Sequence, residues 1–145
     1  VAHLNGKMHI SLDESLCSYN EALWMVENKG VTVFNIRVSK NGGILNCLKL
    51  HELAIKAGVN CQLGAQVGET SILSSAGKIV AAHCGDFLFH EGAAGTHLLK
   101  YDLTDNPVMF GQNGMSKLAD HQTLPGLRIE VNQKALNKMT KEILE

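Results

Sequence analysis

The chain has 145 residues, with 13 basic and 14 acidic side chains and a formal net charge of −1. This length fits one domain of ordinary size, and a composition that is 45% hydrophobic and 19% charged excludes a disordered chain. The near-neutral charge excludes the basic footprint of a nucleic-acid-binding protein, and no run of about 18 apolar residues could span a membrane. The chain opens on Val1 without a signal-peptide pattern, so we expect a processed chain or a piece of a longer one.

Strand and helix patterns alternate over residues 8–91. Four short runs rich in apolar, β-branched or aromatic side chains predict strands, at 8–12, 31–36, 59–63 and 86–90. Three longer runs with helical spacing of apolar residues predict helices between them, at 18–30, 42–58 and 69–85. The first helix has clear local signals, because Ser18 and Glu21 form a capping-box pattern at its start and Gly30 follows its last turn.

The predicted strands end near residues 13, 37, 63 and 90, at intervals of 24, 26 and 27 residues. Strands that alternate with helices in this way predict a parallel sheet built from βα units. In parallel α/β folds, ligands bind at the carboxyl ends of the strands. Those ends carry Asp13, Arg37, Glu91 and a loop at 64–68, so we expect any functional site there.

Residues 96–145 form a C-terminal segment that does not continue this repeat. The stretch 101–126 is rich in Asp, Asn, Gly and Pro and predicts a long irregular connection. A further strand is expected at 127–131, and Asn132 is expected to cap an amphipathic helix that continues through Leu144. We expect this segment to pack against another part of the protein.

The βα part, residues 1–95, fits two folds. One is a complete doubly wound sheet of flavodoxin type, and the other is half of a (β/α)₈ barrel, which as a whole needs about 250 residues. A flavodoxin-like domain needs a phosphate-binding loop after its first strand, and residues 14–18 make a poor one. A receiver-type domain needs an acidic pocket and a distant lysine, which the strand ends do not supply. Periodicity alone leaves the choice open.

Cysteine and histidine patterns suggest neither a disulfide framework nor a zinc site. The four cysteines contain no C-x-x-C pair: Cys17, Cys47, Cys61 and Cys84. Two disulfides would suit a secreted domain, but without a signal peptide we expect reduced thiols in a cytoplasmic protein. The seven histidines are scattered, and the spacing of His90 and His97 fits no helical zinc motif, so we interpret them as ordinary polar or core residues.

Three motifs occur in order at the predicted strand ends. Residues 13–15 read Asp-Glu-Ser, residues 37–44 read Arg-Val-Ser-Lys-Asn-Gly-Gly-Ile, and residues 68–72 read Gly-Glu-Thr-Ser-Ile. In this order and spacing they resemble the C-terminal half of the barrel of the enolase superfamily, in the mandelate racemase and muconate lactonizing subgroup. The resemblance covers roughly residues 8–131, and 125–131 is similar to the segment that returns that family's chain to its capping domain.

The resemblance implies a protein with an α+β capping domain and a barrel, of which this chain would be the C-terminal half. It implies Mg²⁺ at the strand ends and a lyase or isomerase of cycloisomerase, dehydratase or racemase type, in which a base removes the α-proton of a small carboxylate substrate. The chemistry is sound on physical grounds, because charge that develops on carboxylate oxygens must be neutralised in a dry site. Mg²⁺ prefers hard oxygen ligands.

The resemblance also implies roles for single residues. Asp13 matches the family's third metal ligand, on the fifth barrel strand, and Glu14 matches a position that commonly orients a neighbouring cation. Glu91 is similar to the eighth-strand acid that hydrogen-bonds the substrate carboxylate. Gln66 and Glu69 are candidate substrate-binding residues after the seventh strand, although a helix N-terminus also favours the negative charge of Glu69.

Arg37 departs from the family pattern. The muconate lactonizing pattern has a lysine that acts as acid or base at this position, and a second lysine at the position of Lys40. Arginine stays protonated at any working pH, so it is a poor base but can hold an anion. This disfavours two-base racemisation and leaves one-base chemistry, such as β-elimination or cycloisomerisation. We expect Lys40 to point to the helix side of its loop and to serve a structural role.

The rest of the implied site has no match in this chain. The family's two other metal carboxylates and a lysine pair belong to the N-terminal half of the barrel, and a half barrel would leave both sheet edges unpaired. We therefore expect a fragment or one of two complementary chains, inactive alone, whose partner is the N-terminal half, in a cytoplasmic homo-oligomer. The alternative is a catalytically silent family member that binds an acid or only a partner subunit, with Arg37 marking the lost acid–base chemistry.

Overall fold

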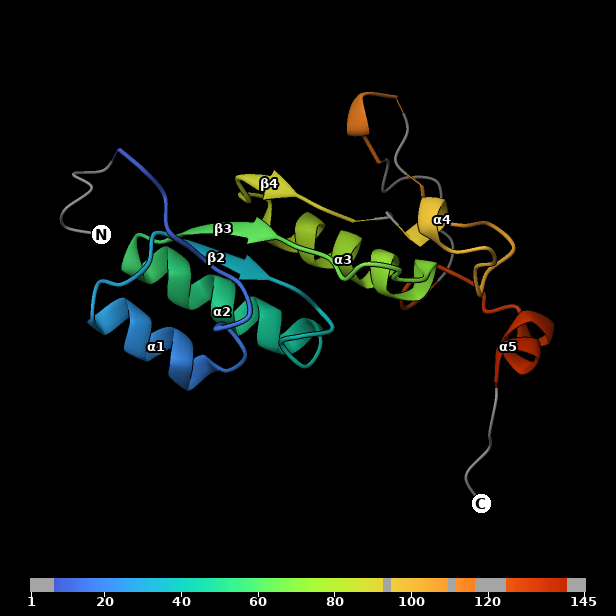
Figure 1. Cartoon of the computed structure of the whole chain (residues 1–145), viewed down its shortest axis with the longest axis horizontal. Coiled ribbons are helices and arrows are strands. Elements are labelled where there is room, and N and C mark those ends of the chain that lie inside the picture. Colours follow the sequence, from blue (N-terminus) through green and yellow to red (C-terminus); the bar gives the residue numbers. More distant parts are fainter. Residues whose placement is uncertain (1–6, 93–94, 110–111, 117–124, 141–145) are drawn as a thin grey trace, which may run out of the picture. The chain divides into compact units, whose positions relative to one another are not determined.

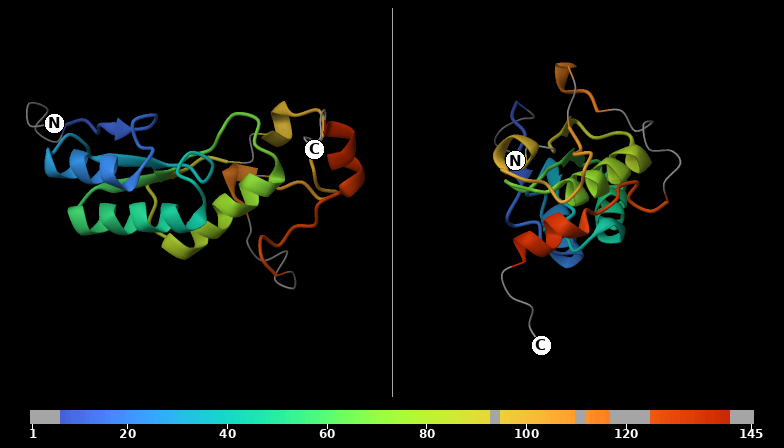
Figure 2. Two further views of the ribbon diagram at one scale, coloured as in Figure 1. Left: turned by 90° about the horizontal axis from the view of Figure 1, so that it is seen from below. Right: turned by 90° about the vertical axis from the view of Figure 1, so that its right-hand side faces the viewer.

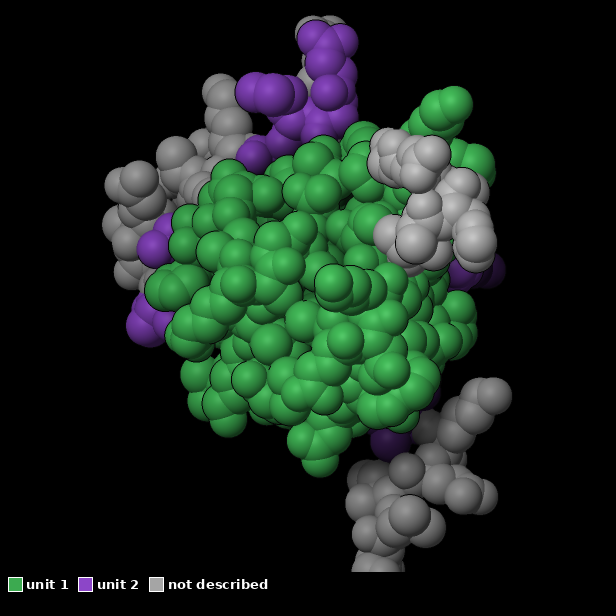
Figure 3. All heavy atoms as spheres, turned by 90° about the vertical axis from the view of Figure 1, so that its left-hand side faces the viewer, with its two compact units in different colours: residues 1–64, 80–91 green, residues 65–79, 92–145 purple. Residues whose placement is uncertain are grey.

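The computed structural model describes residues 7–92, 95–109, 112–116 and 125–140. The chain divides into two compact units, residues 1–64 with 80–91 and residues 65–79 with 92–145 (Figure 3). The first unit contains the whole sheet. The second contains the beginning of the third long helix and the C-terminal segment. The division at residue 95 stays a proposal made from the order of the elements along the chain.

Four parallel strands form one sheet in the order β1-β2-β3-β4 (Figure 1). They are β1 Ser11–Leu12, β2 Val33–Ile36, β3 Asn60–Leu63 and β4 Phe89–His90. The central strands β2 and β3 pair over four residues, and each outer strand pairs over two. The predicted parallel sheet is confirmed, but β1 and β4 are shorter than predicted. At β1 the ladder is interrupted because the Ile10 amide donates to the Thr32 hydroxyl, at 2.7 Å, instead of to a backbone carbonyl.

Two helices, α1 (Tyr19–Glu27) and α2 (Ile44–Ala57), cover one face of this sheet (Figures 1 and 2). The predicted capping box at the start of α1 is confirmed: the Ser18 hydroxyl accepts from the Glu21 amide, and the Glu21 carboxylate accepts from the Ser18 amide at 2.8 Å. A capping box satisfies two backbone donors that the helix itself leaves without partners. The sequence signals therefore place both helices close to where they lie.

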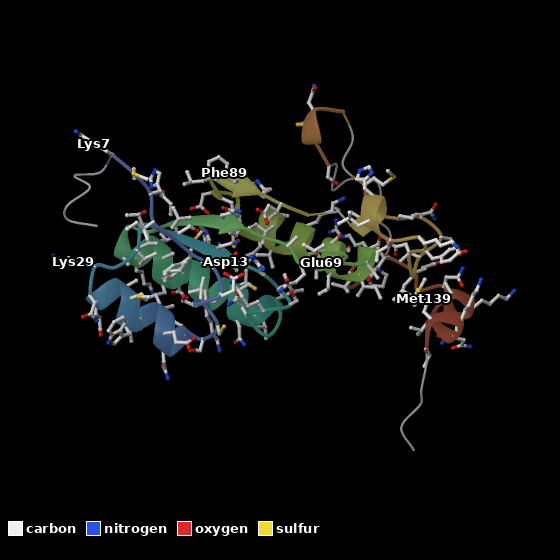
Figure 4. All side chains as sticks on the ribbon, viewed as in Figure 1. Lys7, Asp13, Lys29, Glu69, Phe89 and Met139 are labelled. Carbon is white, nitrogen blue, oxygen red and sulfur yellow. The ribbon has the colours of Figure 1, made fainter. Side chains whose placement is uncertain are left out.

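Alternation along the strands gives the sheet an apolar face and a face of mixed polar and apolar side chains. The side chains that face the helices are buried: Leu12, Phe34, Ile36, Cys61 and Leu63. The opposite face carries Ser11, Val33, Asn35, Asn60, Gln62 and Phe89. Phe89 is 63% exposed and points away from α1 and α2 (Figure 4). The larger apolar side chains thus face the helices, while on the opposite face Val33 and Asn35 are also buried, at 4% and 6% exposed.

The second unit is built around the N-terminal end of α3 (Ser71–Cys84). The Asp102 carboxylate accepts hydrogen bonds from the Ser71 amide at 3.0 Å and from the Ser71 hydroxyl at 2.8 Å. The Ser71 hydroxyl in turn accepts from the Val108 amide at 2.8 Å. These contacts fix the segment after the sheet to the beginning of α3, at a place where a helix leaves backbone donors without partners.

The C-terminal segment contains α4 (Gly95–Leu98), the 3₁₀ helix η2 (Gln112–Gly114) and α5 (Gln133–Met139). Asn132 caps α5 as predicted, because its side-chain oxygen accepts from the Ala135 amide at 2.9 Å. The helix ends at Met139 and Thr140 is extended, so the expected continuation is wrong at this residue; its remaining part, through Leu144, lies outside the described residues. Among the described residues, no helix has the length and apolar character that crossing a membrane requires.

The strand expected at 127–131 is wrong. Gly126 and Arg128 both have positive φ, 64° and 59°, in a turn that cannot continue as an extended strand. Val131 alone makes an isolated antiparallel bridge with Thr104. The alternating apolar residues of this segment resemble a strand, but the turn at Gly126 decides its conformation.

Candidate functional site

The carboxyl ends of β1 and β2 bring three charged side chains together. The two strands are parallel, with Leu12 opposite Phe34, so the residues that follow them leave the sheet at the same edge. Asp13 follows β1 (Figure 4). Arg37 follows β2, and Lys40 lies in the loop after β2. All three were predicted from the sequence as site residues, and the structure brings them into contact.

Both oxygens of the Asp13 carboxylate are bonded to cations. The Arg37 guanidinium donates through Nη2 to Oδ2, and Lys40 Nζ lies 3.0 Å from Oδ1. Lys40 also donates to the backbone carbonyls of Asp13, at 2.5 Å, and Asn35, at 2.9 Å. The side chains of Arg37 and Lys40 are only 14% and 9% exposed, so solvent screens these ion pairs less than surface pairs.

The ammonium group of Lys40 lies at the ends of β1 and β2. Two backbone carbonyls near the ends of β1 and β2, those of Asp13 and Asn35, hold the ammonium group there, and the Asp13 carbonyl also accepts from the Leu16 amide at 2.9 Å. Lys40 therefore fixes the Asp13 side chain relative to its own backbone, because one ammonium group donates to both. The expectation that Lys40 points to the helix side of its loop stays a prediction.

A short loop fixes the position of Arg37. The Asn41 side-chain oxygen accepts from the Arg37 amide at 2.8 Å, and the Asn41 amide donates to the Arg37 carbonyl at 2.9 Å. The Asn41 side-chain NH₂ donates to the Leu16 carbonyl at 2.6 Å, which joins this loop to the one after β1. Gly43, with φ of 105°, then turns the chain into α2 in a conformation that other residues rarely adopt. Asn41 was not predicted; its signal is an asparagine directly before the Gly-Gly pair.

Asn35 and Gly64 also belong to this site and were not predicted. Asn35 lies on β2, two residues before Arg37, and is 6% exposed. Its Oδ1 atom is buried and has no hydrogen-bond partner among the described residues. Gly64, after β3, leaves room for this side chain, because a Cβ at Gly64 would lie 2.1 Å from Asn35 Oδ1 and 3.0 Å from Arg37 Cγ. The sequence shows a glycine here but not what packs against it.

Replacing Gly64 by alanine is expected to displace Asn35 and the stem of Arg37 and to destabilise the protein by about 1–3 kcal/mol, because a methyl group does not fit the space. Urea unfolding measures the change. The control is Gly30→Ala, where the nearest atom to a new Cβ is Met25 Sδ at an ordinary 3.4 Å. Equal stabilities of the two variants would contradict this packing.

Two acids lie at the edge of the site. Glu14 is exposed, with 84% of its side chain accessible, and its Oε1 lies 3.8 Å from Arg37 Nη2, within ion-pair distance. Glu91 directly follows β4: its amide donates to the Leu63 carbonyl at 2.7 Å, and its Oε1 accepts from Gln62 Nε2 at 2.8 Å. The functional roles expected for both residues stay predictions.

Gln66 and Glu69 belong to the second unit and close a turn before α3. Glu69 Oε1 accepts from the Gln66 amide at 2.7 Å, and the Glu69 amide donates to the Gln66 carbonyl at 3.3 Å. Glu69 is 9% exposed, and its carbonyl lies against Gly95 so closely that a Cβ there would meet it at 1.6 Å. These contacts give Glu69 a structural role at the beginning of the helix. Its predicted contact with substrate stays a prediction.

Three of the four cysteine side chains are poor nucleophiles. Burial raises the pKa of Cys47 to about 11 and that of Cys61 to about 12, and it also raises the pKa of Cys84. A thiol with such a pKa carries almost no thiolate at neutral pH, and the thiolate is the reactive form. Cys17 is exposed, and all four cysteines are free. The candidate chemistry therefore rests on the charged cluster.

The donors present allow one ligand for a Mg²⁺ ion. Asp13 is a hard oxygen donor at a strand end, with 32% of its side chain exposed, and fits this role by chemistry. Within the described ranges, no three His, Cys, Asp or Glu side chains gather into a metal-binding group. Arg37 and Lys40 moreover occupy both Asp13 oxygens. A divalent ion about 4 Å from a guanidinium is repelled by roughly 8 kcal/mol at an effective dielectric constant of about 20, so ion and guanidinium compete for Asp13.

Comparison with known sequences places this site in a family. Residues 1–135 match the model of the family described as "Enolase C-terminal domain-like". The N-succinyl-L-Arg/Lys racemase of Bacillus cereus is 31% identical over 147 aligned residues, which cover 97% of this chain and 36% of the relative. The chain thus spans about a third of the length of that relative.

Solved structures give the same result for the fold. The crystal structure of the Bacillus cereus racemase superposes with a TM-score of 0.75 at 28% identity, covering 97% of this chain and 37% of that one. The dipeptide epimerase of Enterococcus faecalis, complexed with Mg and the dipeptide L-Leu-L-Tyr, has a TM-score of 0.65 at 30% identity, covering 70% of this chain and 28% of that one.

Muconate lactonizing enzyme, at 22% identity, shares the fold with a TM-score of 0.81 over 94% of this chain and 37% of that one. The four parallel βα units correspond to the C-terminal part of the barrel in these structures, which confirms the fold predicted as half of a (β/α)₈ barrel. The chain belongs to the enolase C-terminal domain-like family, in the mandelate racemase and muconate lactonizing branch of the enolase superfamily.

Proposed function

We propose that this chain supplies the C-terminal half of the active site of a lyase or isomerase that removes the α-proton of a small carboxylate substrate. Relatives of the family are racemases and epimerases, and one was crystallised with Mg and a dipeptide. The observation that carries the proposal is the contact of Arg37 and Lys40 with Asp13 at the ends of β1 and β2. In a parallel α/β fold this edge is where chemistry takes place.

Asp13 would hold Mg²⁺ as one of its ligands, with further ligands from the N-terminal half of the protein. When bound, Mg²⁺ supplies positive charge next to the carboxylate oxygens of the substrate. Lys40 holds the Asp13 side chain and backbone in place through its three hydrogen bonds, so it orients the ligand carboxylate rather than acting as a base. Glu91 would hydrogen-bond the substrate carboxylate, and Glu14 would orient a neighbouring cation.

Arg37 sets the type of reaction. A guanidinium keeps its proton at any working pH, so Arg37 stabilises negative charge but does not remove a proton. The base then comes from the N-terminal half, and a single base favours cycloisomerase- or dehydratase-type chemistry over two-base racemisation. We further propose that the intact protein acts in the cytoplasm as a homo-oligomer, and that this chain alone is inactive.

A different function is favoured by the same ion pairs. With both Asp13 oxygens bonded to cations, the domain could serve as a catalytically silent member of the family that binds an acid or a partner subunit. Exchange of the substrate α-proton with solvent distinguishes the enzyme from the silent family member. Only the enzyme replaces the α-proton of a bound carboxylate with solvent deuterium.

The test uses the intact protein with Mg²⁺ in D₂O and a panel of N-succinyl amino acids and dipeptides, followed by NMR. We expect α-proton exchange or elimination without racemisation for at least one member.

Glu91→Gln is expected to lower the rate of α-proton exchange or elimination about 10²-fold, while Mg²⁺ affinity stays within about twofold. The reason is that a lost hydrogen bond to the developing charge acts on the reaction rather than on metal binding. Glu27→Gln, an exposed site on α1, is the control. An unchanged rate in Glu91→Gln would remove Glu91 from the site.

A further inference from the structure

We infer that Arg37 is a built-in competitor of the metal ion: it moves between Asp13 and a second carboxylate, and Mg²⁺ binds Asp13 only when Arg37 has moved. The second carboxylate is Glu14 in the ligand-free protein and the carboxylate of the substrate in the complex. This inference rests on the proposed role of Asp13 as a metal ligand. It adds that binding of Mg²⁺ and binding of a carboxylate ligand are coupled, because both depend on the position of Arg37.

The two cations on Asp13 are held in different ways. Lys40 Nζ contacts the neutral backbone carbonyls of Asp13 and Asn35 besides Asp13 Oδ1, so most of its contacts remain when the charge on Asp13 is neutralised. The Arg37 guanidinium donates to the Asp13 carboxylate and also lies 3.8 Å from Glu14 Oε1. When a metal ion neutralises Asp13, the attraction on Arg37 shifts towards Glu14.

Charge and burial make joint occupation unfavourable. Arg37 and Lys40 already place two positive charges at one carboxylate, with side chains 14% and 9% exposed. A divalent ion at the same oxygens would face both charges in a partly desolvated site, where repulsion is stronger than in water. Glu14 is 84% exposed and lies next to the same Nη2 atom, so a small movement of the guanidinium reaches it.

A freed guanidinium is well suited to a substrate carboxylate. Its planar, fork-shaped set of donors matches the two oxygens of a carboxylate, a geometry that a lysine ammonium does not offer. The metal and the carboxylate therefore favour each other's binding, since each removes the partner that the other would have to displace. By linkage, the effect on the two affinities is equal.

The experiment measures Mg²⁺ affinity of the intact protein by calorimetry in wild type, Arg37→Met, Glu14→Gln and the double variant. Arg37→Met is expected to bind Mg²⁺ about tenfold or more tightly than wild type, because the competing charge-assisted hydrogen bond is gone. Lys56→Met removes one positive charge from an exposed pair on α2 and controls for net charge; we expect less than a twofold change.

The double variant shows whether Glu14 affects Mg²⁺ affinity through the movement of Arg37 or only through its own negative charge. Glu14→Gln, an exposed substitution that should leave folding intact, is expected to weaken Mg²⁺ binding severalfold in wild type and to have less than a twofold effect in Arg37→Met. Succinate at saturation should tighten Mg²⁺ binding more in wild type than in Arg37→Met. Mg²⁺ affinity in Arg37→Met at or below wild type would overturn the inference, as would equal effects of Glu14→Gln in both backgrounds. Mg²⁺ binding that ignores Asp13→Asn would overturn the metal assignment as well.

Discussion

Replacing Arg37 by lysine is expected to increase α-proton exchange by about 10²- to 10⁴-fold in the intact protein, the contribution typical of a positioned acid–base group. Once Mg²⁺ neutralises Asp13, the lysine would have the metal ion and Lys40 as positive neighbours at that carboxylate, and positive neighbours and partial burial both lower the pKa of an ammonium group. It could therefore release its proton at neutral pH, which a guanidinium does not do. Proton NMR in D₂O, with the panel of N-succinyl amino acids and dipeptides, measures the rate.

The comparison variant is Arg37→Gln, which removes the positive charge without supplying a base. We expect racemisation to accompany exchange in Arg37→Lys alone, because two bases on opposite faces of the substrate are needed to invert it. Exchange in Arg37→Lys no faster than in Arg37→Gln would show that position 37 does not face the α-carbon of the substrate.

The second large effect is expected for Asp13→Asn. An amide is a weaker oxygen donor than a carboxylate, and we expect Mg²⁺ affinity to fall at least about 100-fold, beyond the effect typical of residues that only support a ligand. The substitution also leaves two partly buried cations without their shared carboxylate, which should lower the free energy of unfolding by about 1–3 kcal/mol. Calorimetry and urea unfolding measure the two quantities.

Asp102→Asn is the matched control, because Asp102 accepts hydrogen bonds at the beginning of α3 and belongs to the second unit. It should lower stability without changing Mg²⁺ affinity. If Asp13→Asn and Asp102→Asn reduced stability alike and left the affinity unchanged, Asp13 would be a structural residue only.

Local signals explain what could be predicted of the fold. The capping box at Ser18, the β-branched run before Ile36 and the glycine that ends α2 act through neighbouring residues, so the sequence identifies them directly. The first edge strand depends on a contact across the chain, with the Thr32 hydroxyl. In the segment 127–131 the local turn at Gly126 and Arg128 outweighs the alternating apolar pattern.

The sequence predicted which charged residues belong to the candidate site, but not which hydrogen bonds they form. Strand spacing and motif order identify Asp13 and Arg37, because strand ends in a parallel sheet converge. Which atoms meet depends on rotamers and on residues without a distinctive pattern, such as Asn35 and Asn41. The contacts of Lys40 were not predictable for the same reason: the backbone carbonyls that attract its ammonium group come together only when two strands lie side by side.

Because the strands differ in length, the ion pairs of Asp13 with Arg37 and Lys40 also stabilise the pairing of β1 with β2. β1 pairs with β2 over two residues and lies at the edge of the described sheet, whereas β2 pairs with β3 over four. Asp13 thus follows one of the two edge strands that pair over only two residues, and Arg37 follows a central strand. The bonds from Arg37 and Lys40 to Asp13 therefore hold the end of the edge strand β1 against the end of the central strand β2.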